Sequence, residues 1–148
     1  MRALRLYEET GDQYSIGILL NNIGNAHTDA GHHMEAFDHL SRALAQWHRI
    51  GNRWGESLTA QGMGHLHMCT GRHEAAVERL TAAVSLARDV GNQDIEFQSL
   101  VELAQAHLHL GDSTTALALL HEALALSRRV NSPRHEEIAI LALARARL

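Results

Sequence analysis

The chain has 148 residues, of which 45% are hydrophobic and 20% are charged, so it can form one domain with a buried core and is too apolar for a disordered chain. Its 13 basic residues are outnumbered by 17 acidic ones, which argues against nucleic acid as a direct ligand. The single cysteine, Cys69, excludes an internal disulfide, and no apolar run approaches the roughly 18 residues of a membrane span. We therefore expect a cytoplasmic protein that does not contact a membrane.

Two series of glycines recur every forty residues, and Asn131 continues the first series. They are Gly11, Gly51 and Gly91, and Gly31, Gly71 and Gly111. Glycine adopts the left-handed conformation that ends a helix, and asparagine tolerates it best among the other residues. Because apolar residues recur at helical spacing between these positions, the pattern predicts helices over residues 1–10, 13–30, 34–50, 53–70, 74–90, 93–110, 114–130 and 133–147. Ser132 and Pro133 form a predicted N-cap and first position of the last helix.

The forty-residue period divides the chain into units of two helices. Small residues recur where helices must approach closely: Gly24 and Gly64 are followed by Ala104, and Ala36 recurs as Ala76 and Ala116. Short connections between helices favour antiparallel pairs, and stacked pairs form a superhelix with a concave wall. The sequence therefore predicts an all-α solenoid in a single domain, with a half unit at 1–11, full units at 12–51, 52–91 and 92–131, and a half unit at 132–148.

Residues forty positions apart occupy the same column of the repeat, and the residues in these columns resemble the pattern of the tetratricopeptide repeat (TPR) family. The family pattern places a small residue within the first helix of a unit, a glycine at the turn and two alanines in the second helix, here Gly24, Gly31, Ala36 and Ala43. The period is forty instead of the usual thirty-four, which matches the long-helix subgroup. The resemblance covers essentially the whole chain and implies a right-handed superhelix that binds protein or peptide ligands without a cofactor. The chain also looks like the arrays of large actinobacterial transcriptional regulators of the SARP/AfsR and STAND types.

Both ends of the chain align with the interior of a unit. Ala3, Leu4 and Tyr7 align with Ala43, Leu44 and Trp47, and the final segment carries the apolar residues Ile138, Ile140, Leu141 and Leu143. Natural arrays end in polar capping repeats. We therefore expect either a fragment of a longer array or a chain whose ends are covered by another copy.

In this family ligands lie along the concave wall, and the resemblance assigns the outward positions of each first helix to that groove. In this chain they are Asn21, Asn25, Thr28 and Asp29; Gln61, His65, Met68 and Cys69; and Val101, Gln105, Leu108 and His109. Side-chain amides suit an extended peptide, since one amide can satisfy both a backbone N–H and a backbone carbonyl. The alternative interpretation is that these are solvated polar residues.

The chain contains 12 histidines but only 4% aromatic residues. His27, His67 and His107 occupy the column in which the family keeps a large aromatic residue, so we expect packing rather than metal binding there. His32, His33 and His73 fall at turns and are expected to be solvated. His65, Cys69 and His109 could in principle hold Zn²⁺, and Asp29 occupies the column of Cys69 one repeat earlier. A His-x-x-x-Cys spacing alone is a weak signal, however, and zinc ligands usually come with supporting carboxylates.

The sequence offers no support for catalysis. It has no phosphate-binding loop, and nothing supplies an oxyanion hole or a third group that would orient a Cys69–His65 pair. We therefore expect a binding scaffold and not an enzyme, with no metal and no cofactor. The alternative function is self-association through the uncapped terminal helices.

Overall fold

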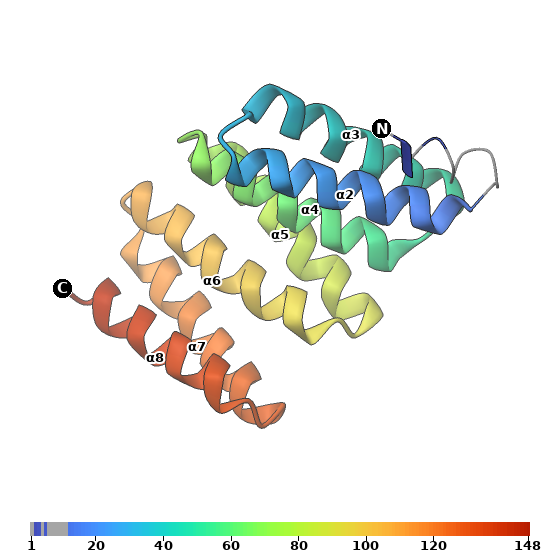
Figure 1. Ribbon diagram of the computed structural model, residues 1–148. Helices are drawn as coiled ribbons and strands as arrows, with labels where there is room; N and C mark the ends of the chain where they lie inside the picture. Colours follow the sequence, from blue (N-terminus) through green and yellow to red (C-terminus); the bar gives the residue numbers. More distant parts are fainter. Residues whose placement is uncertain (1, 4, 6–11) are drawn as a thin grey trace.

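The computed structural model describes residues 2, 3, 5 and 12–148. Residues 12–148 form seven helices and no strand, which confirms the all-α prediction (Figure 1). The helices are α2 (Gln13–Asp29), α3 (His33–Ile50), α4 (Arg53–Cys69), α5 (His73–Val90), α6 (Gln93–His109), α7 (Ser113–Arg129) and α8 (Pro133–Ala146). Every bound lies within one residue of the predicted range. The predicted helix over residues 1–10, with Leu4 and Tyr7, lies outside the described residues.

The helices end where the glycine series predicts. Gly31, Gly51, Gly71, Gly91 and Gly111 all have positive φ, and Asn131 adopts the same conformation with φ 55°. Asparagine can take this conformation because its short polar side chain adds little steric cost there. The left-handed residues therefore separate consecutive helices, and Gly51, Gly91 and Asn131 are the ones that fall at the ends of the predicted units.

Each first helix of a unit begins with a side-chain cap. The caps of α2, α4, α6 and α8 are Asp12, Asn52, Asn92 and Ser132, and each accepts a hydrogen bond from the backbone N–H three residues later. Pro133 occupies the first turn of α8, as predicted. These caps satisfy N–H groups that have no partner within the helix.

Consecutive helices pack as pairs, and the pairs stack into a solenoid with α8 at one edge (Figure 1). Small residues let the two helices of a pair approach. A Cβ atom at Gly24 would lie 2.6 Å from Leu40 Cγ, and one at Gly64 would lie 2.5 Å from Leu80 Cγ. In the third pair Ala104 and Leu120 are buried in the same cluster. A leucine of each second helix therefore packs against a small residue of its first helix.

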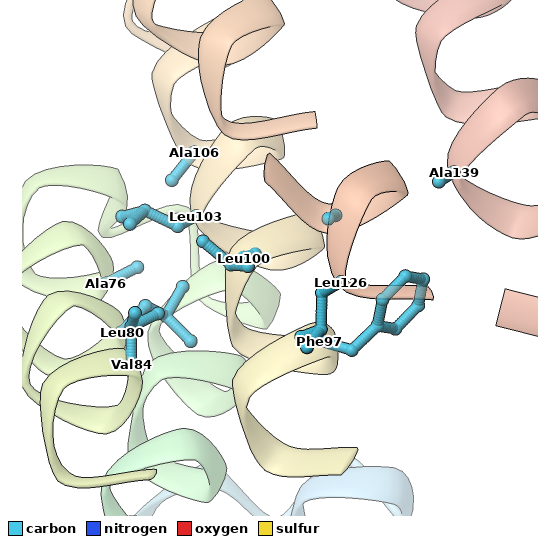
Figure 2. Close-up of a cluster of buried hydrophobic side chains, with 10 residues drawn as sticks. Ala76, Leu80, Val84, Phe97, Leu100, Leu103, Ala106, Leu126 and Ala139 are labelled. Atoms are coloured by element: carbon cyan, nitrogen blue, oxygen red, sulfur yellow. The ribbon is translucent and has the colours of Figure 1, made fainter. Parts of the chain in front are cut away.

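The core runs along the stack and contains side chains from successive pairs. Figure 2 shows Leu80 and Val84 of α5 facing Leu100 and Leu103 of α6. This interface joins the second helix of one unit to the first helix of the next. Within residues 12–148, no helix combines the length and apolar character needed to cross a bilayer.

Candidate functional site

A cleft of about 810 Å³ opens along the first helices of the three stacked pairs and along α8. All of its lining residues come from α2, α4, α6 and α8, so these helices form the wall and the second helices lie behind it. The lining mixes amide, charged and apolar side chains. The concave groove expected from the repeat is therefore present.

The cleft crosses the helices obliquely. From α2 it is lined by Asn25 and Asp29, near the carboxyl end of that helix, whereas from α8 it is lined by Arg134, His135 and Ile138, near the amino end. Each pair is rotated relative to its neighbour in a superhelix. A ligand that follows the cleft would therefore contact a different segment of each first helix.

Eight of the twelve predicted groove residues line this cleft. They are Asn25, Asp29, Gln61, His65, Met68, Cys69, Val101 and Gln105. The structure brings these residues from three helices to one concave surface. Their role in binding stays a prediction.

Two predicted groove residues of α2 lie in the interior instead. Asn21 is 1% exposed, and its Oδ1 accepts a hydrogen bond from Thr59 Oγ1 at 3.0 Å. Thr59 in turn accepts a hydrogen bond from Trp47 Nε1 at 2.9 Å. Thr28 is 5% exposed and donates its hydroxyl hydrogen to the Gly24 carbonyl at 3.2 Å. Both side chains are occupied in structural bonds, so their assignment to the groove is wrong.

The last two predicted residues of α6 also lie outside the cleft lining. Leu108 packs against the buried cluster that contains Ala104 and Leu120. The ring of His109 stacks on His73 of α5, with ring centroids 4.3 Å apart and an interplanar angle of 1°. The cleft lining therefore does not include Leu108 or His109, in contrast to the prediction.

Glu102 is a lining residue of the cleft that bonds to two other lining residues, and the sequence analysis missed it. Its carboxylate accepts a hydrogen bond from Gln61 Nε2, and its Oε2 lies 2.8 Å from His65 Nδ1. The side-chain hydrogen bond to Glu102 raises the pKa of His65, against the opposing effect of partial burial. Glu102 directly follows Val101, a predicted groove residue, in the sequence. A charged residue at that position was the signal from which Glu102 could have been predicted to line the cleft.

Most of the remaining lining residues come from the first two turns of α6 and α8. Sequence reasoning missed these as well: Asp94, Phe97, Gln98, Arg134, His135 and Ile138, together with Gly62 of α4. Phe97 and His135 stack with ring centroids 4.3 Å apart, which joins the two helices at this end of the cleft. Asp94 and Arg134 occupy the same repeat column, as do Gln98 and Ile138. These two shared columns were the signal from which a second set of cleft residues, on α6 and α8, could have been predicted.

The three residues considered as zinc ligands, His65, Cys69 and His109, do not lie together in this structure. Cys69 Sγ lies 3.6 Å from His65 Nε2, whereas His109 stacks on α5. Partial burial raises the pKa of the Cys69 thiol, and the carboxylates of Glu102 and Asp29 add to this effect. Among the residues that the structure describes, no three histidine, cysteine, aspartate or glutamate side chains are arranged to hold a metal ion.

Each histidine of the column has a neighbour on another helix or at a turn. His67 is 8% exposed, with its ring 6.4 Å from Phe37, and burial together with Arg79 and Arg72 lowers its pKa. His107 Nδ1 lies 3.6 Å from Asp112 at the following turn. The packing of these rings agrees with an aromatic-type position.

Comparisons with known proteins place these observations in a family. Two tetratricopeptide repeat models match the chain, one over residues 15–89 and the other over residues 98–137. No curated protein matches the chain at the level of sequence. Among solved structures, the chain is similar to a STAND protein (Signal Transduction ATPase with Numerous Domains) with a tetratricopeptide repeat sensor from Pyrococcus horikoshii, at 15% identity and a TM-score of 0.86.

That similarity covers 98% of this chain and 23% of the archaeal protein, so the chain spans about a quarter of its length. At this identity the similarity shows the fold alone. Tetratricopeptide repeats in general are non-catalytic scaffolds that mediate protein–protein interaction. The family models, the stacked helix pairs and the concave cleft agree: this chain belongs to the tetratricopeptide repeat family.

Proposed function

We propose that the chain binds an extended segment of a protein partner in the cleft lined by α2, α4, α6 and α8. The observation that carries this proposal is the continuous concave surface of about 810 Å³ with mixed polar and apolar lining. The amides of Asn25, Gln98 and Gln105 can each donate to a backbone carbonyl and accept from a backbone N–H. Met68 and Val101 supply apolar contact, and methionine adapts to different side chains.

The charges of the lining indicate which segments are favoured. Asp29, Asp94 and Glu102 carry carboxylates, whereas Arg134 is the only arginine in the lining. Glu102 is already bonded to Gln61 and His65. The carboxylates of Asp29 and Asp94 therefore favour a basic residue in the bound segment, and Arg134 favours an acidic one near α8.

A selected peptide and two double variants test this proposal. A displayed peptide library would first yield a ligand, and fluorescence anisotropy would then measure its Kd. In Asn25→Ala/Gln105→Ala, two lost hydrogen bonds at about 1 kcal/mol each weaken binding roughly thirtyfold. The matched control is Asn22→Ala/Gln93→Ala, which removes two exposed amides of the same helices outside this lining. Equal affinities for the two double variants would contradict the proposal.

Cys69 supplies a second readout for the same proposal. It is the only cysteine of the chain and lies in the cleft lining. A peptide bound in the cleft slows alkylation of this thiol in proportion to occupancy. Saturating peptide that leaves the alkylation rate unchanged would place the binding site elsewhere.

We also propose that the array is the sensing segment of a multidomain bacterial regulator. The support is the similarity to a STAND protein whose tetratricopeptide repeats are described as a sensor. The coding sequence on either side of these residues tests the idea. A nucleotide-binding or DNA-binding domain in the same protein supports it, and an array without either contradicts it.

Self-association is a second candidate, because α8 exposes large apolar side chains. Ile140 is 47% exposed and Leu141 is 50% exposed, whereas Leu100, in the same repeat column as Ile140, is 1% exposed. Contact with a second copy would bury this face. Sedimentation across a range of concentrations would then show a dimer that Ile140→Glu abolishes. The matched control is Leu110→Glu, a leucine 44% exposed elsewhere, and a monomer at all concentrations excludes this candidate.

A further inference from the structure

A second pocket lies between the first and second units, at the end of the stack where α2 connects to α3 and α4 connects to α5 (Figure 1). Its volume is about 290 Å³, and it shares no lining residue with the cleft. Met34 and Phe37 of α3 and Leu66 of α4 supply its apolar lining. Because pockets for small molecules measure about 300–1,000 Å³, this one has room for one or two side chains of a partner.

Much of the apolar lining faces solvent. Met34 is 86% exposed and Phe37 is 47% exposed, whereas Leu66 is buried. Among the described large apolar residues, Leu148 alone is more exposed than Met34. Contact with an apolar side chain would remove both exposed residues from water, and methionine adapts to the shape of what it contacts. The pocket therefore favours a large apolar side chain.

The charge of the pocket is positive. Its ionisable lining residues are His33, His67 and Arg72, without a carboxylate among them. Burial, followed by Arg79 and Arg72, lowers the pKa of His67, and Glu78 has the opposite effect. In the part of the chain that the structure describes, Arg72 forms no ion pair with a carboxylate. The guanidinium of Arg72 is therefore a permanent positive charge that is available to a partner.

Two helix starts add to this charge, and nearby acids limit its extent. α3 begins at His33 and α5 begins after Arg72, both without a side-chain cap. The N–H groups of such a helix start carry a partial positive charge. Acidic residues follow closely on the same helices, namely Glu35, Asp38 and Glu74. They repel an extended anionic surface such as a membrane or a nucleic acid, so the pocket favours one or two carboxylates beside Arg72.

The next boundary between units shows that stacking does not require these residues. Forty positions later, Met34, Leu66 and Arg72 are followed by Glu74, Ala106 and Asp112. An acid thus replaces the exposed methionine, a small residue replaces the leucine and a negative charge replaces the positive one. Because α5 and α6 pack without the large apolar residues and the arginine, their presence at the first boundary calls for another explanation.

We propose that this pocket binds a segment of a protein partner that carries a large apolar side chain next to one or two carboxylates. The apolar side chain contacts Met34, Phe37 and Leu66, and a carboxylate pairs with Arg72. The site is separate from the cleft, so its occupation does not depend on the peptide binding proposed there.

A displayed library of random short peptides tests the site. Selection on the full chain is combined with depletion on Phe37→Ser/Arg72→Glu, which keeps the cleft lining and so removes cleft binders. We expect enrichment of leucine, isoleucine or phenylalanine next to aspartate or glutamate. Fluorescence anisotropy then measures the Kd of the most enriched peptide.

Single variants measure the two parts of the contact. Phe37→Ala removes a half-exposed ring and should weaken binding roughly tenfold. Arg72→Gln removes an exposed ion pair and should weaken it by up to about fivefold. The matched controls are Leu110→Ala and Arg129→Gln, which remove an exposed leucine and an exposed arginine elsewhere.

Charge reversal separates recognition by Arg72 from a structural role. A peptide in which lysine replaces the carboxylate should bind Arg72→Glu more tightly than it binds the unsubstituted chain. Four results would overturn the proposal: no enrichment of an acid beside an apolar residue, equal affinity of the acidic peptide for Arg72→Glu and the unsubstituted chain, loss of binding in Asn25→Ala/Gln105→Ala, which would place the peptide in the cleft, or a dimer that Phe37→Ala abolishes, which would assign the pocket to a second copy.

Discussion

Gly55→Ala tests the packing around Trp47, which joins α2, α3 and α4. The indole ring is fully buried, and its Nε1 donates to Thr59 Oγ1 at 2.9 Å. A Cβ at Gly55 would lie 2.1 Å from Trp47 Cδ2, and a Cβ at Gly17 would lie 2.5 Å from Cη2 of the same ring. The ring is therefore held between two backbones and cannot move away from either.

The expected loss of stability follows from two opposing effects. Replacing a helical glycine with alanine contributes about 1 kcal/mol of helix propensity. Overpacking typically costs about 1–3 kcal/mol, and we expect the upper end, because carbon atoms in contact are about 3.5–4.0 Å apart and this Cβ would be 2.1 Å from the ring. Gly55→Ala should therefore lower the free energy of unfolding by about 2 kcal/mol. At about 2–4 °C per kcal/mol, the melting temperature falls by roughly 4–8 °C.

Gly62→Ala is the matched control, because its Cβ would meet Asn25 Oδ1 at 2.8 Å, the mobile end of a side chain in the cleft. It should be neutral or stabilising by up to about 1 kcal/mol. Circular dichroism during thermal and urea unfolding measures both variants. Gly55→Ala with the stability of the unsubstituted chain, or Gly62→Ala with an equal loss, would refute the reasoning.

Three further predictions concern single polar groups. His65 has a raised pKa because it is bonded to Glu102. Its stabilising contribution is therefore fully present below the pKa of an unfolded histidine and is lost as pH rises through the folded value. His65→Gln should remove that part of the decline in melting temperature above about pH 6.5, and parallel profiles of melting temperature against pH for the two proteins would contradict this. Asn52→Ala removes the bond from Gly55 N–H to Asn52 Oδ1 and should cost about 1 kcal/mol in urea unfolding, whereas Asn52→Asp retains the cap; equal losses would show that the cap contributes nothing. The raised pKa of the Cys69 thiol predicts slower alkylation by iodoacetamide near pH 8 in the folded chain than in the denatured one, and Glu102→Gln should accelerate the folded rate; a rate unaffected by this substitution would contradict the electrostatic part of the argument.

Helix boundaries were predictable from the sequence because they depend on local chemistry. Gly51 and Gly91 end second helices through a left-handed backbone that other residues rarely adopt, and Asn52 and Asn92 cap the next helices with their own side chains. Each of these effects lies within one turn of the residue that causes it. A forty-residue period then repeats the same information along the chain.

The lining of the cleft was less predictable because a column describes a position within a unit, whereas exposure depends on the neighbouring units. Asn21, Gln61 and Val101 share a column, yet Asn21 is buried against Thr59 while the other two line the cleft. The superhelical rotation moves the lining from the carboxyl end of α2 to the amino end of α8, where Arg134 enters. In a solenoid, then, the repeat sequence determines which residues meet within a pair, and the rotation between pairs determines which of them a ligand can reach.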